Sequence, residues 1–193
     1  MTDDADITAW ALAAGRGDRD AAARFIGATQ HPVRRFLAAL ISPAEADDLA
    51  QETYLRAMRS LPSFAARSSA LTWLLGIARR VAVDHVRAAS ARLRTVPMSD
   101  FYDIPDASRS GFDRQVVLER LIAALPADRR EAFVATQVLG LSYAEAAEVC
   151  GCPVGTIRSR VARAREDLVA AMNTQPLRRR RTPGDAAGST TRP

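Results

Sequence analysis

The segment from 158 to 165 reads RSRVARAR, with four arginines and no acidic residue. Guanidinium groups suit phosphates and guanine edges, so the chemistry available here is nucleic-acid binding. Just before it, Cys150 and Cys152 offer two thiols. Residues two apart are badly placed for a disulfide, and the histidines needed to complete a metal site are limited to His31 and His85. We interpret Cys150 as a small buried residue and Cys152 as a turn residue, and expect no metal or cofactor.

A helix-turn-helix pattern surrounds the arginines. Ser142 and Glu145 form a capping box that opens a short helix, with Ala144 and Ala147 as its small inner positions. A left-handed Gly151 can end this helix. Pro153 then starts the second helix, whose apolar face must point into the domain and consists of Ile157, Val161, Ala164 and Leu168.

The opposite face of the second helix carries Ser159, Ala162 and Arg163, and its flanks carry Arg158, Arg160 and Arg165. Such a helix, supported by another behind it, has the geometry that enters a DNA major groove. The alternative is an amphipathic surface helix whose arginines are only solvated.

Helical spacing of apolar residues continues along nearly the whole chain, and no stretch alternates as a strand would. We predict an all-α fold of two small helical domains joined by a flexible linker, the C-terminal one containing the helix-turn-helix. Pro32 should end or kink the helix that precedes it. The expected divisions are a domain at 5–92, a linker at 93–112, a domain at 113–172 and a disordered basic tail at 173–193.

Capping boxes locate two further helices. Ser42, Pro43 and Glu45 predict a helix from 42 to about 60, and DRRE at 128–131 predicts one in the second domain. Another long helix is expected from 71 to 91, with His85 on its buried stripe.

Charge and hydropathy exclude some classes of protein. All 27 basic residues are arginine and the net charge is +5, but the excess lies mainly in the tail, where Arg178 to Arg181 either touch DNA or are inert. Apolar stretches such as ALTWLLGIA are too short to cross a bilayer, and the acidic start MTDDAD is unlike a signal peptide, so we expect a cytoplasmic protein. No grouping of nucleophile, base and metal ligands suggests an enzyme.

Two outward surfaces are predicted in the first domain. Residues 43–52 contain four acids and no base, which suits a basic protein partner or merely an acidic first turn; the outward residues are Asp47, Asp48, Gln51 and Glu52. The long helix has an outer stripe suited to stacking on bases and binding phosphates: Trp73, Arg80, Asp84 and Arg87. The alternative for this stripe is a second packing seam with an Arg80–Asp84 ion pair.

Three segments in order resemble the extracytoplasmic-function (ECF) sigma factors of the bacterial sigma-70 family: ADDLAQETYLRAMRSLPSF at 46–64, SSALTWLLGIARRVAVDHVR at 68–87, and ALPADRREAFVATQVLGLSYAEAAEVCGCPVGTIRSRVARAR. The resemblance implies two partners, core RNA polymerase and promoter DNA, and no catalytic site. Many relatives are also held by an anti-sigma factor. The alternatives are a stand-alone helix-turn-helix regulator and a helical adaptor.

The resemblance also implies roles for individual residues. The acidic patch would bind the clamp helices of the largest polymerase subunit. The loop after residue 62 would capture a flipped base of the minus-10 element. Its serines, Ser63, Ser68 and Ser69, can hydrogen-bond a base edge or equally cap the next helix, Arg67 would bind a phosphate, and Phe64 belongs to the same minus-10 surface. Minus-35 bases would face Arg158, Ser159, Ala162 and Arg163, with phosphates nearer Thr156, Arg160 and Arg165. Family members often carry Asn at the position of Arg80, which leaves the preferred minus-10 bases open.

Overall fold

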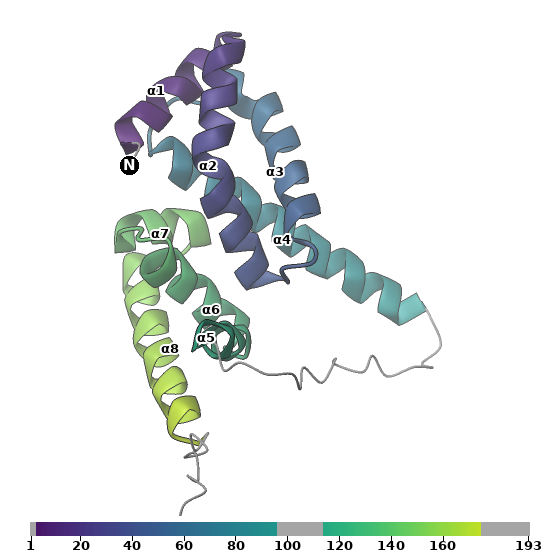
Figure 1. The fold of residues 1–193 in the computed structure, drawn as a ribbon, viewed down its shortest axis with the longest axis vertical. Helices are drawn as coiled ribbons and strands as arrows, with labels where there is room; N and C mark the ends of the chain where they lie inside the picture. Colours follow the sequence, from purple (N-terminus) through teal and green to yellow (C-terminus); the bar gives the residue numbers. More distant parts are fainter. Residues whose placement is uncertain (1–2, 96–113, 175–193) are drawn as a thin grey trace, which may run out of the picture.

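The computed structural model describes residues 3–95 and 114–174, all of whose regular elements are helical (Figure 1). The first unit comprises α1 (Asp4–Gly15), α2 (Arg19–Leu40), α3 (Ala46–Ser60), the short 3-10 helix η1 (Leu61–Ser63) and α4 (Ala70–Thr95). The second unit comprises α5 (Arg114–Ala123), α6 (Ala127–Phe133), its π-helical continuation η2 (Val134–Val138), α7 (Tyr143–Cys150) and α8 (Val154–Thr174). The all-α prediction is confirmed. Most of the predicted linker and nearly all of the predicted tail lie outside the described residues.

Helix α2 continues through Pro32, although proline disfavours the interior of a helix. Asp18 caps it by accepting a hydrogen bond from the backbone nitrogen of Ala21 at 3.0 Å. The buried stripe continues on both sides of Pro32, with Phe25 before it and Phe36 after it. Of the two predicted outcomes, an end or a kink, the end is excluded because α2 continues to Leu40. Packing of this stripe compensates for the hydrogen bond that proline cannot donate.

Helix α3 begins later than predicted, at Ala46, and ends as predicted at Ser60. The Ser42 hydroxyl accepts a bond from the Glu45 backbone nitrogen at 3.3 Å and donates to the Glu45 carboxylate at 2.8 Å. The prediction of a buried His85 is wrong. Its side chain is half-exposed, and its Nε2 lies 2.7 Å from Glu45 Oε1, which connects α4 to the start of α3.

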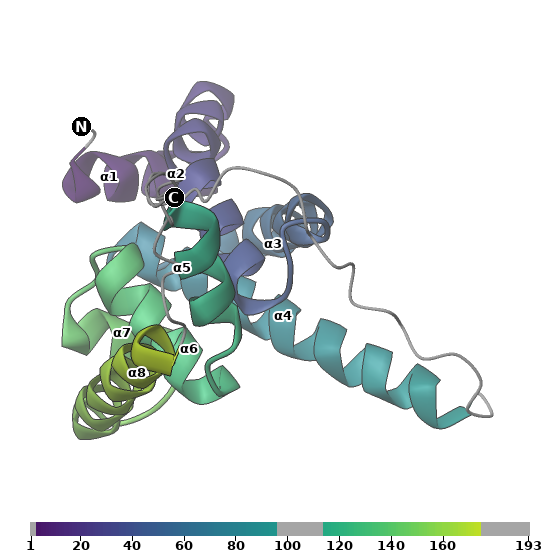
Figure 2. The same ribbon diagram turned by 60° about the horizontal axis from the view of Figure 1, so that its bottom comes forward.

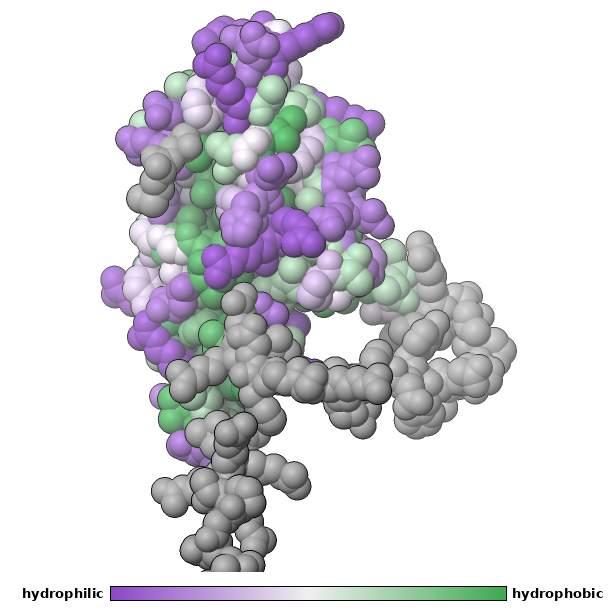
Figure 3. Space-filling model, viewed as in Figure 1, coloured by the Kyte–Doolittle hydropathy of each residue, from purple (hydrophilic) through white to green (hydrophobic). Residues whose placement is uncertain are grey.

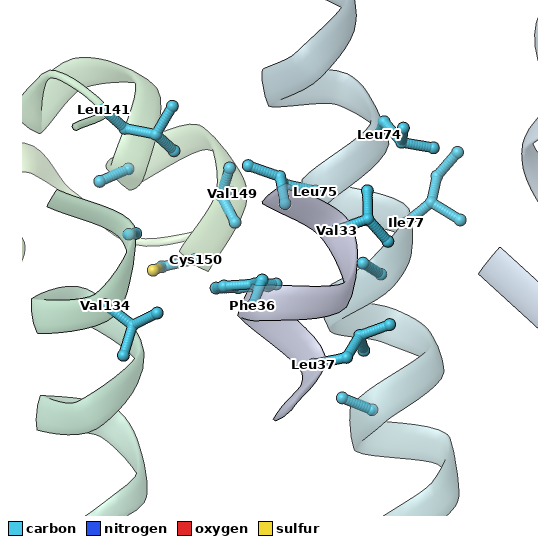
Figure 4. Packing of buried hydrophobic residues seen from close by; sticks show 14 of the residues in the cluster. Val33, Phe36, Leu37, Leu74, Leu75, Ile77, Val134, Leu141, Val149 and Cys150 are labelled. Carbon is cyan, nitrogen blue, oxygen red and sulfur yellow. The ribbon is translucent and has the colours of Figure 1, made fainter. Parts of the chain in front are cut away.

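The hydrophobic core runs without interruption through both units. Helix α7 packs on α4, and α6 packs on α2 (Figures 1 and 2). Close by, Phe36 of α2 points toward Cys150 of α7, and Val149 lies beside Leu75 of α4 (Figure 4). The two units were expected from the sequence, but this contact between them was not.

The surface is polar over much of the face seen in Figure 3, with a broken band of apolar residues running from the first unit into the second. The C-terminal end of α4 projects beyond the other helices (Figure 2). Within the described ranges, no helix is both long and apolar enough to cross a membrane.

Candidate nucleic-acid interface

The turn between α7 and α8 has the predicted geometry. The Ser142 hydroxyl accepts from the Glu145 backbone nitrogen at 3.2 Å, and the Glu145 carboxylate accepts from the Ser142 nitrogen at 2.8 Å, which completes the capping box. Gly151 ends α7 with φ 62° and ψ 40°. One detail is corrected: Ala144 is exposed, and Ala146 packs inward with Ala147. The turn sets the angle at which α8 leaves α7.

We predict that Gly151→Ala lowers the free energy of unfolding by about 1–2 kcal/mol, because an L-residue is strained in the left-handed region. Gly155→Ala in α8 is a matched control. A Cβ at either glycine meets nothing within 4 Å, but only Gly151 has a positive φ. Urea unfolding of the two variants measures the difference, and an equal effect at both sites would contradict the role given to Gly151.

Helix α8 separates buried from exposed residues as predicted. Ile157, Val161 and Ala164 are at most 1% exposed, and Leu168 is also buried. The exposed positions are Arg158, Ser159, Ala162, Arg163 and Arg165, while Thr156 and Arg160 are half-buried. This arrangement leaves an arginine-rich surface turned to solvent. Its assignment to minus-35 DNA stays a prediction.

Two of the arginines on α8 also hold the helix in place. Arg160 Nε lies 3.3 Å from Asp128 Oδ2, and Arg165 Nη2 donates to the Gln137 side-chain oxygen at 2.8 Å. A third link, missed in the sequence, joins Arg129 to Asp167 at 2.6 Å. Arg158 and Arg163 have no side-chain partner among the described residues, so their guanidinium groups are available to a ligand.

The cysteines occupy the predicted positions. Cys150 is 3% exposed, and Cys152 is half-buried in the turn. Burial, followed by the nearby Glu131 charge, raises the pKa of the Cys150 thiol to about 12. That thiol therefore stays protonated at neutral pH, which disfavours both nucleophilic and metal-binding roles.

A pocket of about 350 Å³ gathers most of the minus-10 residues that were predicted in the loop after residue 62. Phe64 and Trp73 line it with ring centroids 4.8 Å apart, tilted by 40°. Ser63, Arg67 and Ser68 also line it. An aromatic pair beside hydroxyl and guanidinium groups can stack on a base and hydrogen-bond its edge.

For Ser69 the structure supports the alternative role as a helix cap. Its hydroxyl accepts a hydrogen bond from the Thr72 backbone nitrogen at 3.2 Å at the start of α4. The sequence did not predict that Glu148 of α7 also lines this pocket, together with residues of the first unit.

Only part of the predicted outer stripe of α4 lies at a pocket. Trp73 and Arg80 line a second, adjacent pocket with Arg56 of α3. The alternative Arg80–Asp84 pair is wrong, because Asp84 is held by Arg56 at 2.7 Å while Arg80 donates to the Gly76 carbonyl at 3.2 Å. Asp84 and Arg87 are exposed farther along α4 and line neither pocket.

Two acids of the predicted acidic patch on α3 are paired with arginines, which the sequence did not indicate. Asp47 pairs with Arg34 of α2, and Glu52 pairs with Arg56 at 2.7 Å. The hydrogen bond from Arg34 lowers the pKa of Asp47. Within the described part of the chain, Asp48 and Gln51 have no side-chain partner. Leu55, an apolar side chain that is 50% exposed, lies about one turn after Gln51 and two turns after Asp48.

An ion pair between the two units was also missed. Arg79 of α4 donates to the carboxylate of Glu131 in α6, whose side chain is only 10% exposed. The predicted capping role of Glu131 is therefore wrong, since α6 begins after Pro126 without a side-chain cap. Burial raises the pKa of Glu131, while Arg79 opposes that rise.

Comparison with known proteins identifies the family to which both units are similar. Residues 25–92 match the model of the family described as Sigma-70 region 2, and residues 115–168 match that described as Sigma-70, region 4. The chain is 53% identical over 171 residues to the ECF RNA polymerase sigma factor SigC of Mycobacterium tuberculosis, covering 88% of this chain and 92% of that protein. It is 32% identical over 181 residues to the ECF RNA polymerase sigma-E factor of Escherichia coli, covering 86% and 92%.

Solved structures agree. The sigma factor RpoE in complex with the anti-sigma factor NepR from Bartonella quintana has a TM-score of 0.65 and 29% identity, covering 79% of this chain and 96% of that one. CnrH in complex with the cytosolic domain of CnrY has a TM-score of 0.69 at 23% identity, covering 88% and 99%, and shows the shared fold. The chain therefore belongs to the sigma-70 family of RNA polymerase sigma factors, within its extracytoplasmic-function group.

Proposed function

We propose that this protein binds core RNA polymerase in the cytoplasm, recognises minus-35 and minus-10 promoter elements, and supports promoter opening. The observation that carries this proposal is the pairing of two distinct surfaces in one sigma-family chain. One is the exposed arginine face of α8, and the other is the aromatic pocket at Phe64 and Trp73. The first suits duplex DNA and the second suits an unpaired base.

The two units are proposed to bind different partners. Residues 5–92 would bind polymerase and the minus-10 element, and residues 113–172 would bind the minus-35 element. The protein would contribute no catalytic group. Because the Bartonella quintana relative was solved with an anti-sigma factor, we also propose a partner of that class for this chain.

Run-off transcription tests the proposal. Purified protein is mixed with sigma-free core polymerase and genomic DNA fragments, and the start sites are mapped. We expect initiation at a set of promoters that share two spaced elements. A stand-alone helix-turn-helix regulator would instead protect a DNA site without core, and failure to initiate while a control sigma factor succeeds would refute the proposal.

Charge reversal on α3 tests the polymerase surface separately. Asp48→Arg should weaken binding to core by about tenfold or more, because a basic partner surface would then meet a like charge. Asp20→Arg is the matched control, since Asp20 is an exposed acid on α2 outside the patch. Binding is measured by titrating labelled variants with core, and equal affinities for the two variants would argue against this patch as the contact.

A further inference from the structure

Gln137 lies near the end of η2, the π-helical segment that continues α6. Helix α6 packs on α8 (Figure 1). Segments of π-helix are rare and occur frequently at functional sites. From this position the side-chain oxygen of Gln137 accepts a hydrogen bond from Arg165 Nη2 at 2.8 Å. Two exposed residues that are 28 positions apart thus meet at the surface of the second unit.

The other end of the Gln137 amide is bound as well. Its Nε2 donates to the Thr136 hydroxyl at 3.1 Å, and that hydroxyl donates to the Ala132 carbonyl at 2.8 Å. The Thr136 side chain is buried. Because a hydroxyl has a single hydrogen, Thr136 can only accept from Gln137 while it donates to Ala132. The hydrogen bonds therefore run without a break from the backbone of α6 to the guanidinium group of Arg165.

This series of hydrogen bonds fixes which atom of the amide faces α8. Rotating the Gln137 amide by half a turn would place its NH₂ group against the guanidinium group of Arg165, and both groups are donors. The same rotation would place its carbonyl against a Thr136 hydroxyl that has no hydrogen left to donate. Gln137 therefore presents an acceptor to Arg165 in one orientation only.

Arg165 uses only part of its hydrogen-bonding capacity in this contact. A guanidinium group carries five N–H donors in a planar arrangement, and Gln137 is the one side-chain partner of Arg165 among the described residues. Arg160 differs, because it is paired with the carboxylate of Asp128. An amide carries no charge, so Gln137 orients the guanidinium group of Arg165 without neutralising it. The remaining donors are available to an anion.

A second arginine lies on the same flank of α8. Arg158 is exposed and precedes Arg165 by seven residues, which is close to two helical turns. The two residues are therefore about 10 Å apart along the helix axis. A flank with two uncompensated guanidinium groups suits the backbone of a nucleic acid, where phosphates repeat along each strand.

We propose that Gln137 is a positioning residue for DNA binding, and that it holds the Arg165 guanidinium group in the orientation that binds one phosphate of the minus-35 element. A side chain that is fixed before binding loses less conformational freedom in the complex, which favours binding. This inference rests on the proposed function and adds to it a residue outside the helix-turn-helix.

Four variants separate positioning from a purely structural link between η2 and α8. Gln137→Met keeps the length of the side chain and removes both of its hydrogen bonds. Thr136→Val removes the hydroxyl that orients the amide, while Thr136→Ser retains it. Arg165→Ala removes the guanidinium group itself. The matched control is Gln30→Met, since Gln30 is an exposed glutamine on α2.

The readout is the affinity of each holoenzyme for duplexes that contain the minus-35 element of a promoter mapped with the wild-type protein. Each phosphate of the element is replaced in turn by a neutral methylphosphonate, and affinity is measured over a range of salt concentrations. One replacement should weaken wild-type binding and have no effect on Arg165→Ala. The log–log salt slope of Arg165→Ala should be smaller than that of wild type by about 0.9.

Gln137→Met should bind the unmodified duplex about two- to tenfold more weakly than wild type, because Arg165 must then be immobilised on binding. It should also lose most of the wild-type sensitivity to the neutral linkage identified with Arg165. Thr136→Val should shift both measurements in the same direction. Thr136→Ser and Gln30→Met should bind like wild type.

The same sensitivity of Gln137→Met and wild type to every neutral linkage would overturn the proposal, because Gln137 would then only connect η2 to α8. Wild-type affinity for Gln137→Met would also overturn it. Circular dichroism establishes that each variant is folded. If the wild-type holoenzyme neither initiates nor binds the minus-35 duplex, the proposed function itself fails and this inference fails with it, which is a different result.

Discussion

Arg163→Ala should lower transcription from cognate promoters by about tenfold or more. A well-placed arginine–guanine pair contributes about 1–3 kcal/mol of discrimination, and Arg163 is exposed on α8 opposite the buried Ile157. Its guanidinium group has no partner among the described residues, so the substitution should leave folding intact. The loss is measured by run-off transcription from the mapped promoters and by binding to minus-35 duplexes with single base changes.

Arg120→Ala is the matched control for this experiment, because Arg120 is an exposed arginine of the second unit that lies on α5 rather than α8. It should leave transcription unchanged. Arg163 would lose its assignment if its removal altered neither minus-35 affinity nor base preference.

The second large effect is expected at the contact between the units. Phe36 is fully buried and points from α2 toward Cys150 of α7 (Figure 4). Phe36→Ala should lower the free energy of unfolding by about 3–5 kcal/mol, because it removes apolar contacts and leaves a cavity. Urea unfolding gives this value, and small-angle X-ray scattering should show an expanded particle as the units separate.

Leu118→Ala is the control for losing an apolar side chain, since Leu118 is 48% exposed on α5. It should change stability by less than about 0.5 kcal/mol. A loss of under about 1 kcal/mol for Phe36→Ala, with no expansion, would mean that the two units are not packed in solution through this residue.

The contact between the units also explains why two charged residues, Arg79 and Glu131, lie on otherwise apolar helix faces. Arg79 shares an α4 face with Leu75 and Ala82, at spacings of four and three residues. Glu131 shares a face with the buried Ala135. A charged residue on an apolar helix face indicates that it has a partner elsewhere in the fold. The sequence pattern alone does not identify that partner.

Local interactions explain what was predictable from the sequence. The Ser142–Glu145 capping box, the left-handed Gly151 and the inward face of α8 depend on residues within a few positions of one another. Their energetics are decided by short-range geometry, which sequence spacing expresses directly. The two helical units followed from such patterns, whereas the sigma-family resemblance rested on three longer segments in order.

Errors arose where a local preference competed with packing or with a distant charge. Pro32 did not end α2 because the buried stripe crosses it. Glu131 did not cap α6 because the helix begins at Ala127, before the expected box, and its carboxylate binds Arg79, 52 residues away. Asp84 did not pair with Arg80 because Arg56, 28 residues away, binds it. In each case a tertiary contact was present that the local pattern did not express.

By itself, the amino-acid sequence determined the helices, the helix-turn-helix and the residues that α8 turns outward, because helical periodicity and capping act over a single turn or two. Only the tertiary structure decided that Glu148 lines the pocket of Trp73 and that Glu131 holds Arg79. These contacts depend on how two separate helical surfaces pack, and ion-pair and apolar contacts between them have no fixed spacing along the chain.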